Sequence, residues 1–488
     1  MDLSILGSPS AFLRSHLGEL PHLELLAKLE SWWRAKGEAI STAVDRAGTP
    51  WLKMFDAAGE RVDALLMSGG YRELLLEGYR AGVVWRGFEE ESLVSPFLLG
   101  YLTSFFDPGL YCPYTVSLST ALPLAKYGTP ELKERFLVPL LRRDGSVWQG
   151  ATWMTEIGGG SDLGANVLTT ARPAGEKWLL SGEKYFASNV GAELAVVAAR
   201  PEGAPEGVRG LALFLVPRER TGGGLNYLVR RLKDKVGTRS VPTGEVELRE
   251  SEGYRLGPPG QGIYHILEVL NVSRIANSVA AVALAQRALA DAAAFAGRRV
   301  AFGRPVLEQP LLACQFAERC EGLQDAFALA WEAVRLLDAV WREEPPYSER
   351  YHLFRLVAHL AKYWTADFAV KSATWGIEIH GGLGVLAEFP AERHLREALV
   401  LAIWEGTSHR QILDGLEVAA HKGAHRLLLG HFEGDGGEEL AAAVARLDEL
   451  LRLSEAEREA EGEAVFAGLA AALARALRAR LVRRGAIE

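Results

Sequence analysis

Apolar and polar residues recur at helical spacing over two long parts of the chain. Near the N-terminus the pattern covers residues 24–40 and 72–85, which predicts amphipathic helices. It returns in a longer form after about residue 263, where four long helices joined by short connections are typical of a bundle. The helices predicted there cover residues 267–299, 311–342, 352–379 and 390–404, followed by 407–423.

Between about residues 149 and 256 the pattern changes to short apolar runs of strand composition, separated by glycine and proline turns. Closely spaced local strands favour an antiparallel sandwich or barrel over a parallel sheet. The runs predicted to be strands are 178–188, 194–199, 211–216 and 243–248.

Two further expectations concern the N-terminal region. The segment 106–115, FDPGLYCPYT, contains two prolines and a glycine and is predicted to be a loop. Residues 117–141 are predicted to form two helices separated at Gly128, with Thr129 capping the second and Pro130 at its first position.

These patterns predict an α+β protein that is mostly helical. We expect an N-terminal helical domain (1–150), a middle antiparallel β domain (151–262), a four-helix bundle (263–425) and a helical C-terminal extension (426–488). A chain of 488 residues is too long for one hydrophobic core, which agrees with several domains. The extension ends in RALRARLVRR, which clusters five arginines.

Net charge, apolar runs and cysteine content indicate which classes of protein to exclude. A net charge of −8 argues against a general nucleic-acid binder, although a local basic patch would escape this argument. No secretory signal and no run of eighteen uninterrupted apolar residues is visible, so no membrane span is expected. Cys112, Cys314 and Cys320 form no CxxC pair, which indicates inert buried thiols and a reducing, cytoplasmic setting.

Residues 154–162, MTEIGGGSD, combine two hydroxyls, a carboxylate and three consecutive glycines. Such a run exposes backbone N–H groups where the chain must approach a ligand closely, and it would suit a flat, acceptor-rich cofactor. The alternative is a tight polar turn with no ligand.

A second candidate is WEGT, from Trp404 to Thr407, in which Glu405 stands between an indole and a glycine. Burial against an aromatic surface raises the pKa of a carboxyl group toward the range of a general base at neutral pH. The alternative is an ordinary helix-terminal glutamate in water.

Two other segments are ambiguous by themselves. EIHGGLG, from Glu378 to Gly384, follows a helix rather than a strand, so a glycine helix cap explains it better than a dinucleotide fingerprint. His380 has no second ligand at helical spacing, and no metal site is expected. RVAFGRP, from Arg299 to Pro305, offers two arginines to phosphate oxygens or, alternatively, to the end of a helix.

Taken together, five blocks in this order and spacing resemble the acyl-CoA dehydrogenases, FAD flavoproteins that oxidise the Cα–Cβ bond of acyl thioesters. The blocks are MTEIGGGSD, GEKYFASN, RVAFGRP, EIHGGLG and WEGTS, and the resemblance covers residues 85–420. It implies the same three-domain order that the hydrophobic pattern predicts. It also implies an acyl-CoA substrate, an electron-transferring flavoprotein as acceptor, and a homotetramer or dimer that shares FAD between subunits.

The resemblance also implies roles for individual residues. Glu405 occupies the catalytic base position, whereas the alternative base position used by a minority of the family is Ser273 here. Thr407 is expected beside the cofactor, and the substrate is expected near Ser161, Asn271 and Arg274. The flavin is expected to lie against Met154, Thr155, Gly160, Ser161, Phe186 and Ser188. The diphosphate and adenine held by a neighbouring subunit are expected at Arg299, Phe302, Glu378, Gly381 and Gly382.

Within this family the chain is most similar to the AidB branch, the flavoproteins of the adaptive response to alkylation. The similarity rests on LKDKVGTRSVPTGEV (232–246), FGRPVLEQPL, IWEGTS and the C-terminal extension. It implies, as an alternative to acyl-CoA oxidation, a DNA-associated protein with vestigial dehydrogenase activity. The DNA would bind Arg475, Arg478, Arg480, Arg483 and Arg484, or these arginines would form a solvated helix face.

Overall fold

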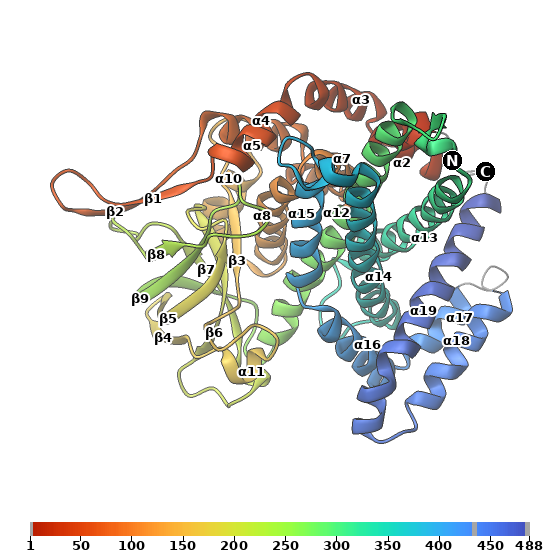
Figure 1. The fold of residues 1–488 in the computed structure, drawn as a ribbon. Coiled ribbons are helices and arrows are strands. Elements are labelled where there is room, and N and C mark those ends of the chain that lie inside the picture. The colour runs from red at the N-terminus through yellow and green to blue at the C-terminus, as the bar shows by residue number, and fades with distance from the viewer. Residues whose placement is uncertain (1–2, 432–436, 484–488) are drawn as a thin grey trace. The chain divides into compact units, whose positions relative to one another are not determined.

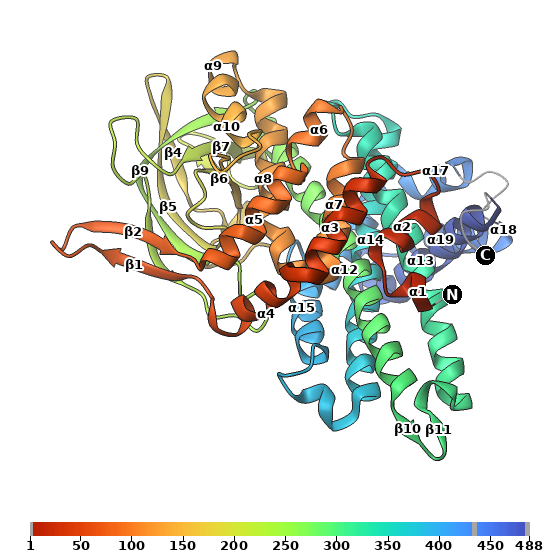
Figure 2. The same cartoon turned by 90° about the horizontal axis from the view of Figure 1, so that it is seen from above.

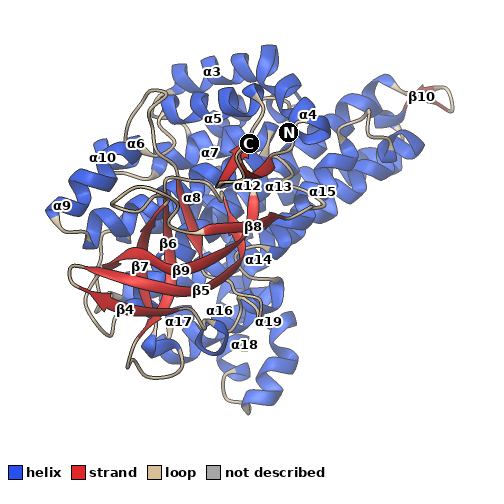
Figure 3. Cartoon of the chain, turned by 90° about the vertical axis from the view of Figure 1, so that its left-hand side faces the viewer, coloured by secondary structure: helices blue, strands red, loops and turns tan. Residues whose placement is uncertain are grey.

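The computed structural model describes residues 3–431 and 437–483 (Figure 1). The chain forms two compact units whose boundaries do not follow the order of the sequence. The helical unit consists of Met1–Ala35, Leu93–Pro108 and Arg274–Glu488, and the barrel unit of Lys36–Ser92 and Gly109–Ser273. Figure 3 shows by colour which parts of the chain are helices, strands and loops.

The N-terminal third of the chain supplies short helices to both units. In the helical unit these are α1 (Leu3–Leu6), α2 (Pro9–Leu17), α3 (Leu23–Trp32) and α7 (Val94–Phe106). In the barrel unit they are α4 (Glu38–Ala47), α5 (Gly69–Ala81), α6 (Trp85–Glu89), α8 (Pro108–Tyr127), α9 (Pro130–Leu132) and α10 (Val138–Leu140). Two π-helical turns, Trp33–Gly37 and Lys133–Leu137, lie among them.

The loop predicted over residues 106–115 is wrong, because α8 begins at Pro108 and continues through Pro113. A proline at the first helical position loses no hydrogen bond, and burial of this whole segment stabilises the helix. The predicted break at Gly128 is confirmed. Thr129 caps α9 by accepting a hydrogen bond from the Leu132 N–H at 3.4 Å.

A hairpin in the barrel unit was missed by the sequence analysis. It is formed by β1 (Trp51–Phe55) and β2 (Arg61–Leu66), within a region expected to be helical. Its turn is closed by Asp56, whose carboxylate accepts hydrogen bonds from two backbone N–H groups. The hairpin is held at β2, where Asp63 accepts the Val229 N–H at 2.8 Å. The alternating pattern of WLKMF was its signal.

The β domain is a small barrel. Its strands are β3 (Gly150–Trp153), β4 (Thr170–Ala174), β5 (Lys177–Ser188), β6 (Leu194–Pro201), β7 (Ala212–Pro217), β8 (Leu228–Leu232) and β9 (Thr243–Leu256). The pairings β6–β4–β5–β9–β7–β6 close a ring, while β3 and β8 pair with β6 and β9. The predicted antiparallel arrangement holds except at β6, which runs parallel to β3 and β4. A short helix, α11 (Leu163–Asn166), follows the glycine-rich segment.

The bundle matches the predicted helices closely and lies in the helical unit, except for the N-terminal part of its first helix, which belongs to the barrel unit as far as Ser273. Its helices are α12 (Gly262–Arg298), α13 (Pro310–Val340), α14 (Glu349–His380), α15 (Ala391–Ile403) and α16 (Ser408–Lys422). A small hairpin, β10 (Val300–Ala301) and β11 (Arg304–Pro305), joins α12 to α13 at one end of the bundle (Figure 2). By length and composition α12 could cross a membrane, but 72% of its most apolar window is buried, as expected of a core helix.

The C-terminal extension packs onto the bundle through α17 (Ala424–His431), α18 (Gly437–Leu450) and α19 (Glu455–Arg483) (Figure 1). One face of α19 is fully buried and includes Leu469, Leu473 and Leu477. The extension is therefore an integral part of the helical unit. The cysteines need one correction, because Cys314 on α13 is exposed whereas Cys112 and Cys320 are buried.

The barrel core provides a test of this fold. Phe214 on β7 is 0% exposed within the barrel core, whereas Phe55 on β1 is 50% exposed. Truncating a buried phenylalanine to alanine costs about 3–5 kcal/mol of stability. We expect F214A to lower the melting temperature measured by circular dichroism by several degrees, and F55A, the same chemical change, to leave it within about a degree. Equal effects of the two substitutions would contradict the described core.

Candidate active site

Glu405 lies in the short turn between α15 and α16, in a strained backbone conformation. Its φ is 59°, in the left-handed region, and that of the following Gly406 is 98°. A left-handed glutamate is unfavourable because its Cβ crowds the backbone, and such residues persist only where the surroundings fix them. The strain marks Glu405 as a position where orientation matters more than local stability.

The carboxyl group of Glu405 is largely shielded from water. The residue as a whole is part-buried, but its Oε2 atom is buried and has no hydrogen-bond partner among the described residues. Burial raises the pKa of Glu405 to about 7, against the opposing charges of Arg274 and Lys362. A carboxyl group with this pKa exchanges a proton readily near neutral pH, as a general base requires.

Side chains from α14 and α16 donate hydrogen bonds to backbone carbonyl groups in and next to this turn. Gln411 Nε2 donates to Glu405 O at 2.9 Å and to Gly406 O at 3.1 Å. Since the amide nitrogen donates there, Gln411 Oε1 must accept from His359 Nδ1 at 2.9 Å, which fixes the tautomer of His359. Lys362 Nζ donates to Ala402 O at 3.1 Å and to Gly406 O at 2.6 Å.

Lys362, His359 and Gln411 were missed by the sequence analysis. Their signal was a set of polar residues at positions where the helical pattern expects apolar ones. His359 and Lys362 lie three residues apart on the buried face of α14. Burial lowers the pKa of His359 to about 3, so this ring is neutral.

Arg274 is the second buried cation beside Glu405. It lies on α12, is 5% exposed, and approaches Asp414 of α16 at 3.5 Å. Asp414 also accepts from Arg410, which orients it. The same helix carries Asn271 and Ser273, both buried, and the Ser273 hydroxyl lies 3.4 Å from that of Ser119. Ser273 carries no carboxylate, so the position that a minority of the family uses for the base holds none in this chain.

The residues predicted to face the flavin lie in the barrel unit, around the loop that follows β3. Met154 is buried, Thr155 is half-buried, and Ser161 is exposed at the end of the glycine run. A Cβ at Gly160 would collide with the Thr155 hydroxyl, so only glycine permits this close approach. The Thr155 carbonyl accepts from the Tyr185 N–H at 3.0 Å, which ties the loop to β5.

A buried ion pair anchors the same loop. Lys184 Nζ donates to Glu156 Oε1 at 2.6 Å, and Glu156 also accepts from Leu168 N, Thr169 N and Thr169 Oγ1. Burial lowers the pKa of Lys184, and the charge of Glu156 opposes this shift. The carboxylate of the glycine-rich motif is therefore a structural anchor.

Phe186 and Ser188 stand on the outward side of β5. The pairing of β5 with β9 shifts register between Lys184 and Ala187, and such a bulge re-aims side chains. As a result Phe186 is 53% exposed, and the ammonium group of Lys233 lies 4.7 Å from its ring centroid. The barrel unit thus presents an aromatic ring and a hydroxyl on one strand.

The remaining predicted cofactor residues apart from Thr407 gather in the helical unit, at the end of the bundle that carries β10 and β11 (Figure 2). Phe302, at the tip of this hairpin, is 98% exposed. Glu378, Gly381 and Gly382 are exposed at the end of α14, and a Cβ on Gly381 would lie 3.8 Å from the Arg299 guanidinium. His380 packs inside the bundle, stacked on Phe295 at 4.4 Å.

These two sets of residues suit the chemistry of FAD. Glycine backbone and the Arg299 guanidinium match diphosphate oxygens, and exposed aromatic rings match flat heterocycles. The Thr407 side chain makes no capping hydrogen bond at the start of α16, although threonine is a good cap. Its hydroxyl is therefore not required by the helix.

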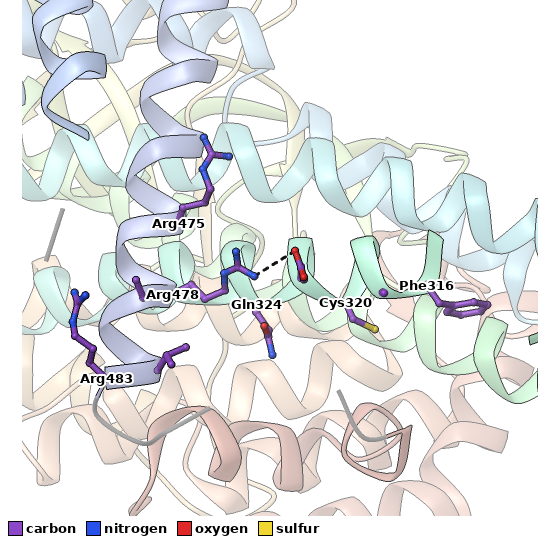
Figure 4. Close-up of a pocket in the computed structure, with 10 residues that line it drawn as sticks. Phe316, Cys320, Gln324, Arg475, Arg478 and Arg483 are labelled. Carbon is purple, nitrogen blue, oxygen red and sulfur yellow. Dashed lines mark ion pairs between the residues drawn. The ribbon is translucent and has the colours of Figure 1, made fainter. Parts of the chain in front are cut away.

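A separate pocket of about 740 Å³ lies between α13 and α19 (Figure 4). Two of the three arginines that line it pair with acidic residues. Arg478 pairs with Asp325 at 2.8 Å and with Glu321 at 3.7 Å, and Arg475 pairs with Glu439. Its lining residues include Phe316, Cys320, Glu321, Gln324, Arg475, Arg478 and Arg483. Arg480 donates to the His431 carbonyl at 3.0 Å, and Arg484 lies outside the described residues.

Family models match three consecutive parts of the chain. The acyl-CoA dehydrogenase C-terminal domain matches residues 260–419, and the acyl-CoA dehydrogenase middle domain matches residues 151–251. The N-terminal domain of the adaptive response protein AidB matches residues 23–144.

Similar proteins agree with these matches. Acyl-CoA dehydrogenase family member 11 of Caenorhabditis elegans is 32% identical over 465 residues, which cover 91% of this chain and 74% of that protein. AidB of Escherichia coli strain K12 is 28% identical over 430 residues, which cover 83% of this chain and 76% of that protein.

Solved structures share the fold over almost the whole chain. The structure of C. elegans ACDH-11 in complex with C11-CoA has a TM-score of 0.84 at 26% identity, covering 98% of this chain and 90% of that one. The Bd2924 apo-form has a TM-score of 0.87 at 29% identity, with 98% and 96% covered. The chain thus belongs to the acyl-CoA dehydrogenase family, whose members are FAD-dependent oxidoreductases of the CH–CH bond of acyl-CoA, and its N-terminal part is similar to that of AidB.

Proposed function

We propose that this protein oxidises the Cα–Cβ bond of an acyl-CoA thioester, with Glu405 as the base that removes the α-proton. The observation that carries the proposal is the buried Glu405 carboxyl group, held in a left-handed turn, with its pKa raised by burial to about 7. At neutral pH about half of the molecules carry such a group in its ionised form, which can accept a proton, and its raised pKa makes it a stronger base than an ordinary carboxylate.

The chain contributes in three ways to this reaction. Glu405 takes the proton, and burial excludes water that would otherwise solvate the carboxylate. A proton next to a thioester is only weakly acidic, so the developing negative charge on the thioester oxygen needs a donor, for which we propose the Glu405 N–H. We propose that Arg274, which pairs with Asp414 at 3.5 Å, binds the substrate, and that Asn271 and Ser161 do so as well.

FAD, when bound, supplies the hydride acceptor at its N5 atom. We propose that Met154, Thr155, Gly160, Ser161, Phe186, Ser188 and Thr407 hold its flavin part. Arg299, Phe302, Glu378, Gly381 and Gly382 would hold the diphosphate and adenine part of the FAD of a neighbouring subunit. The exposed Phe302 supports this assignment, since an aromatic ring so fully in water is unfavourable without a partner.

The same reasoning extends to the partners. Tetramers are typical of the family, and we propose a homotetramer, or a dimer, that covers the exposed end of the bundle. For the electron acceptor we propose an electron-transferring flavoprotein. Three free cysteines, with no disulfide among them, support a cytoplasmic location.

A second candidate is association with DNA through α19, as proposed for an AidB-type protein. The observation that favours it is the row of arginines along this helix, of which Arg475, Arg478 and Arg483 line the pocket in Figure 4. Glu439, Asp325 and Glu321 already neutralise two of these arginines, so phosphate would have to displace them. We therefore rank this candidate below acyl-CoA oxidation.

Replacing the base tests the leading candidate. We expect E405Q to retain bound FAD but to lose a factor of about 10²–10⁴ in the rate at which an acyl-CoA bleaches the flavin anaerobically, because an amide cannot take the proton. E417Q, on the exposed side of α16, is the matched control and should behave like the wild type. Flavin reduction by E405Q at the wild-type rate would reject Glu405 as the base.

The raised pKa predicts a pH dependence. Only ionised Glu405 can accept a proton, so kcat/KM should fall about tenfold for each pH unit below a midpoint of about 7. Stopped-flow reduction from pH 5 to pH 9 measures this acid limb. A midpoint near 4.5, the ordinary value for a glutamate, would mean that the carboxyl group is solvated in the working enzyme.

DNA binding is tested with point variants. Deleting residues 470–488 would remove the buried Leu473, Leu477 and Leu481 and so unfold α19. The second candidate predicts salt-sensitive duplex binding that the double variant R475Q/R478Q weakens several-fold and that R446Q, at an exposed arginine on α18, leaves unchanged. Equal binding by both variants would exclude α19 as the DNA surface.

A further inference from the structure

A buried lysine lies in the middle of α14 without a carboxylate partner. Lys362 is 1% exposed, and no carboxylate of the described residues lies within ion-pair distance of its Nζ atom. Lysine is almost never fully buried unless it is paired, because removing an ammonium group from water is costly. A lysine in this position therefore calls for an explanation beyond packing.

The partners of Lys362 are two carbonyl groups that flank Glu405. Nζ donates to Ala402 O at 3.1 Å, in the last turn of α15, and to Gly406 O at 2.6 Å. The last carbonyls of a helix have no partner inside the helix and attract positive charge. One ammonium group thus ties the main chain before Glu405 to the main chain directly after it.

These bonds act on the strained part of the turn. Glu405 and Gly406 both have positive φ angles, a conformation that a glutamate leaves unless it is held. Gln411, on α16, donates hydrogen bonds to the carbonyls of both residues. Lys362 and Gln411 together fix the direction in which the Glu405 side chain leaves the backbone.

A neutral donor would satisfy the same carbonyl groups, so the charge of Lys362 has a separate effect. Burial disfavours the ionised form of the Glu405 carboxyl group. The charges that favour the ionised form are those of Arg274 and Lys362. Conversely, burial lowers the pKa of Lys362 to about 7, and Glu405 is the one charge that supports its protonated form.

The other ionisable groups of this cluster keep their charge near neutral pH. Arg274 stays positive, and the pKa of Asp414 is lowered, despite burial, by the hydrogen bond from Arg410 and by the charge of Arg274, so Asp414 stays negative. His359 is neutral because burial lowers its pKa to about 3. Arg355 and Arg410 are the remaining charges that act on Arg274. Glu405 and Lys362 are thus the groups whose charge changes near pH 7.

We propose that Lys362 is a positioning residue for the base: its ammonium group fixes the main chain on both sides of Glu405, and its charge favours the carboxylate that accepts the α-proton. This inference rests on the proposed function, in which Glu405 is the base. Lys362 itself touches neither substrate nor cofactor in this role and acts through Glu405.

Three variants test the proposal by their pH profiles. K362M removes both the hydrogen bonds and the charge, K362Q keeps a donor without the charge, and K371M makes the same change at an exposed lysine of α14. We expect the acid limb of kcat/KM to move up by about one pH unit in K362M and K362Q, since an opposite charge close to a carboxyl group lowers its pKa by this order. On the alkaline plateau K362Q should retain most of the rate, and K362M should lose about tenfold. K371M should match the wild type.

The protonation of Glu405 can also be followed without catalysis, by the pH dependence of the melting temperature. The pKa of Glu405 is about 7 in the folded protein and near 4.5 when unfolded, so its protonated form stabilises the fold at low pH and this stabilisation is lost as pH rises to about 7. The melting temperature of the wild type relative to E405Q should therefore fall over pH 4.5–7. In a K362Q background the fall should extend about one pH unit higher.

The outcomes separate this inference from the proposed function. If E405Q reduces the flavin normally, the base assignment fails. If E405Q is inactive but K362M and K362Q slow the reaction equally at every pH, with no change in the acid limb or in the melting-temperature difference, Lys362 is merely structural and the inference is overturned. Should K362M fail to fold, K362Q with its retained donor still decides the result.

Discussion

The proposed reaction depends on one constraint: the carboxyl group of Glu405 must be shielded from water and must still be able to ionise near neutral pH. Burial alone would protonate Glu405 throughout the neutral range, and full exposure would make it too weak a base. Two buried cations, Arg274 and Lys362, oppose the effect of burial without forming a hydrogen-bonded ion pair with Glu405. The result is a pKa of about 7, which neither effect would produce by itself.

Contacts from three helices fix the conformation of the turn that carries Glu405. Lys362 and His359 come from α14, Gln411 from α16, and the Ala402 carbonyl from α15. Each contact is an ordinary hydrogen bond, yet together they hold a left-handed glutamate that none could hold alone. The long helices of the bundle therefore serve as a rigid frame for a turn of four residues.

Much of this arrangement could be predicted from the sequence. The helices of the bundle, four of the seven strands of the barrel and the cap at Thr129 follow from periodicity and from glycine and proline positions, whereas β3, β4 and β8 were not predicted. The β1–β2 hairpin and the start of α8 could not, because burial and contacts with distant residues such as Val229 decide them. Glu405 was proposed as the base from its motif. Lys362 was not, since a single lysine in a helical pattern reads as surface until its neighbours are known.

The discontinuous helical unit has a consequence for how the chain is made. Its first segment, Met1–Ala35, and its last helix, α19, are separated by almost the full length of the polypeptide. On the ribosome the strands of the barrel emerge within one stretch and can pair early, whereas α2 must wait for α13, whose Phe327 packs against Phe12 at 5.2 Å. The nascent protein thus carries an incomplete helical unit until these later helices have emerged, so a stalled or shortened product would expose apolar faces of the unit to chaperones and proteases.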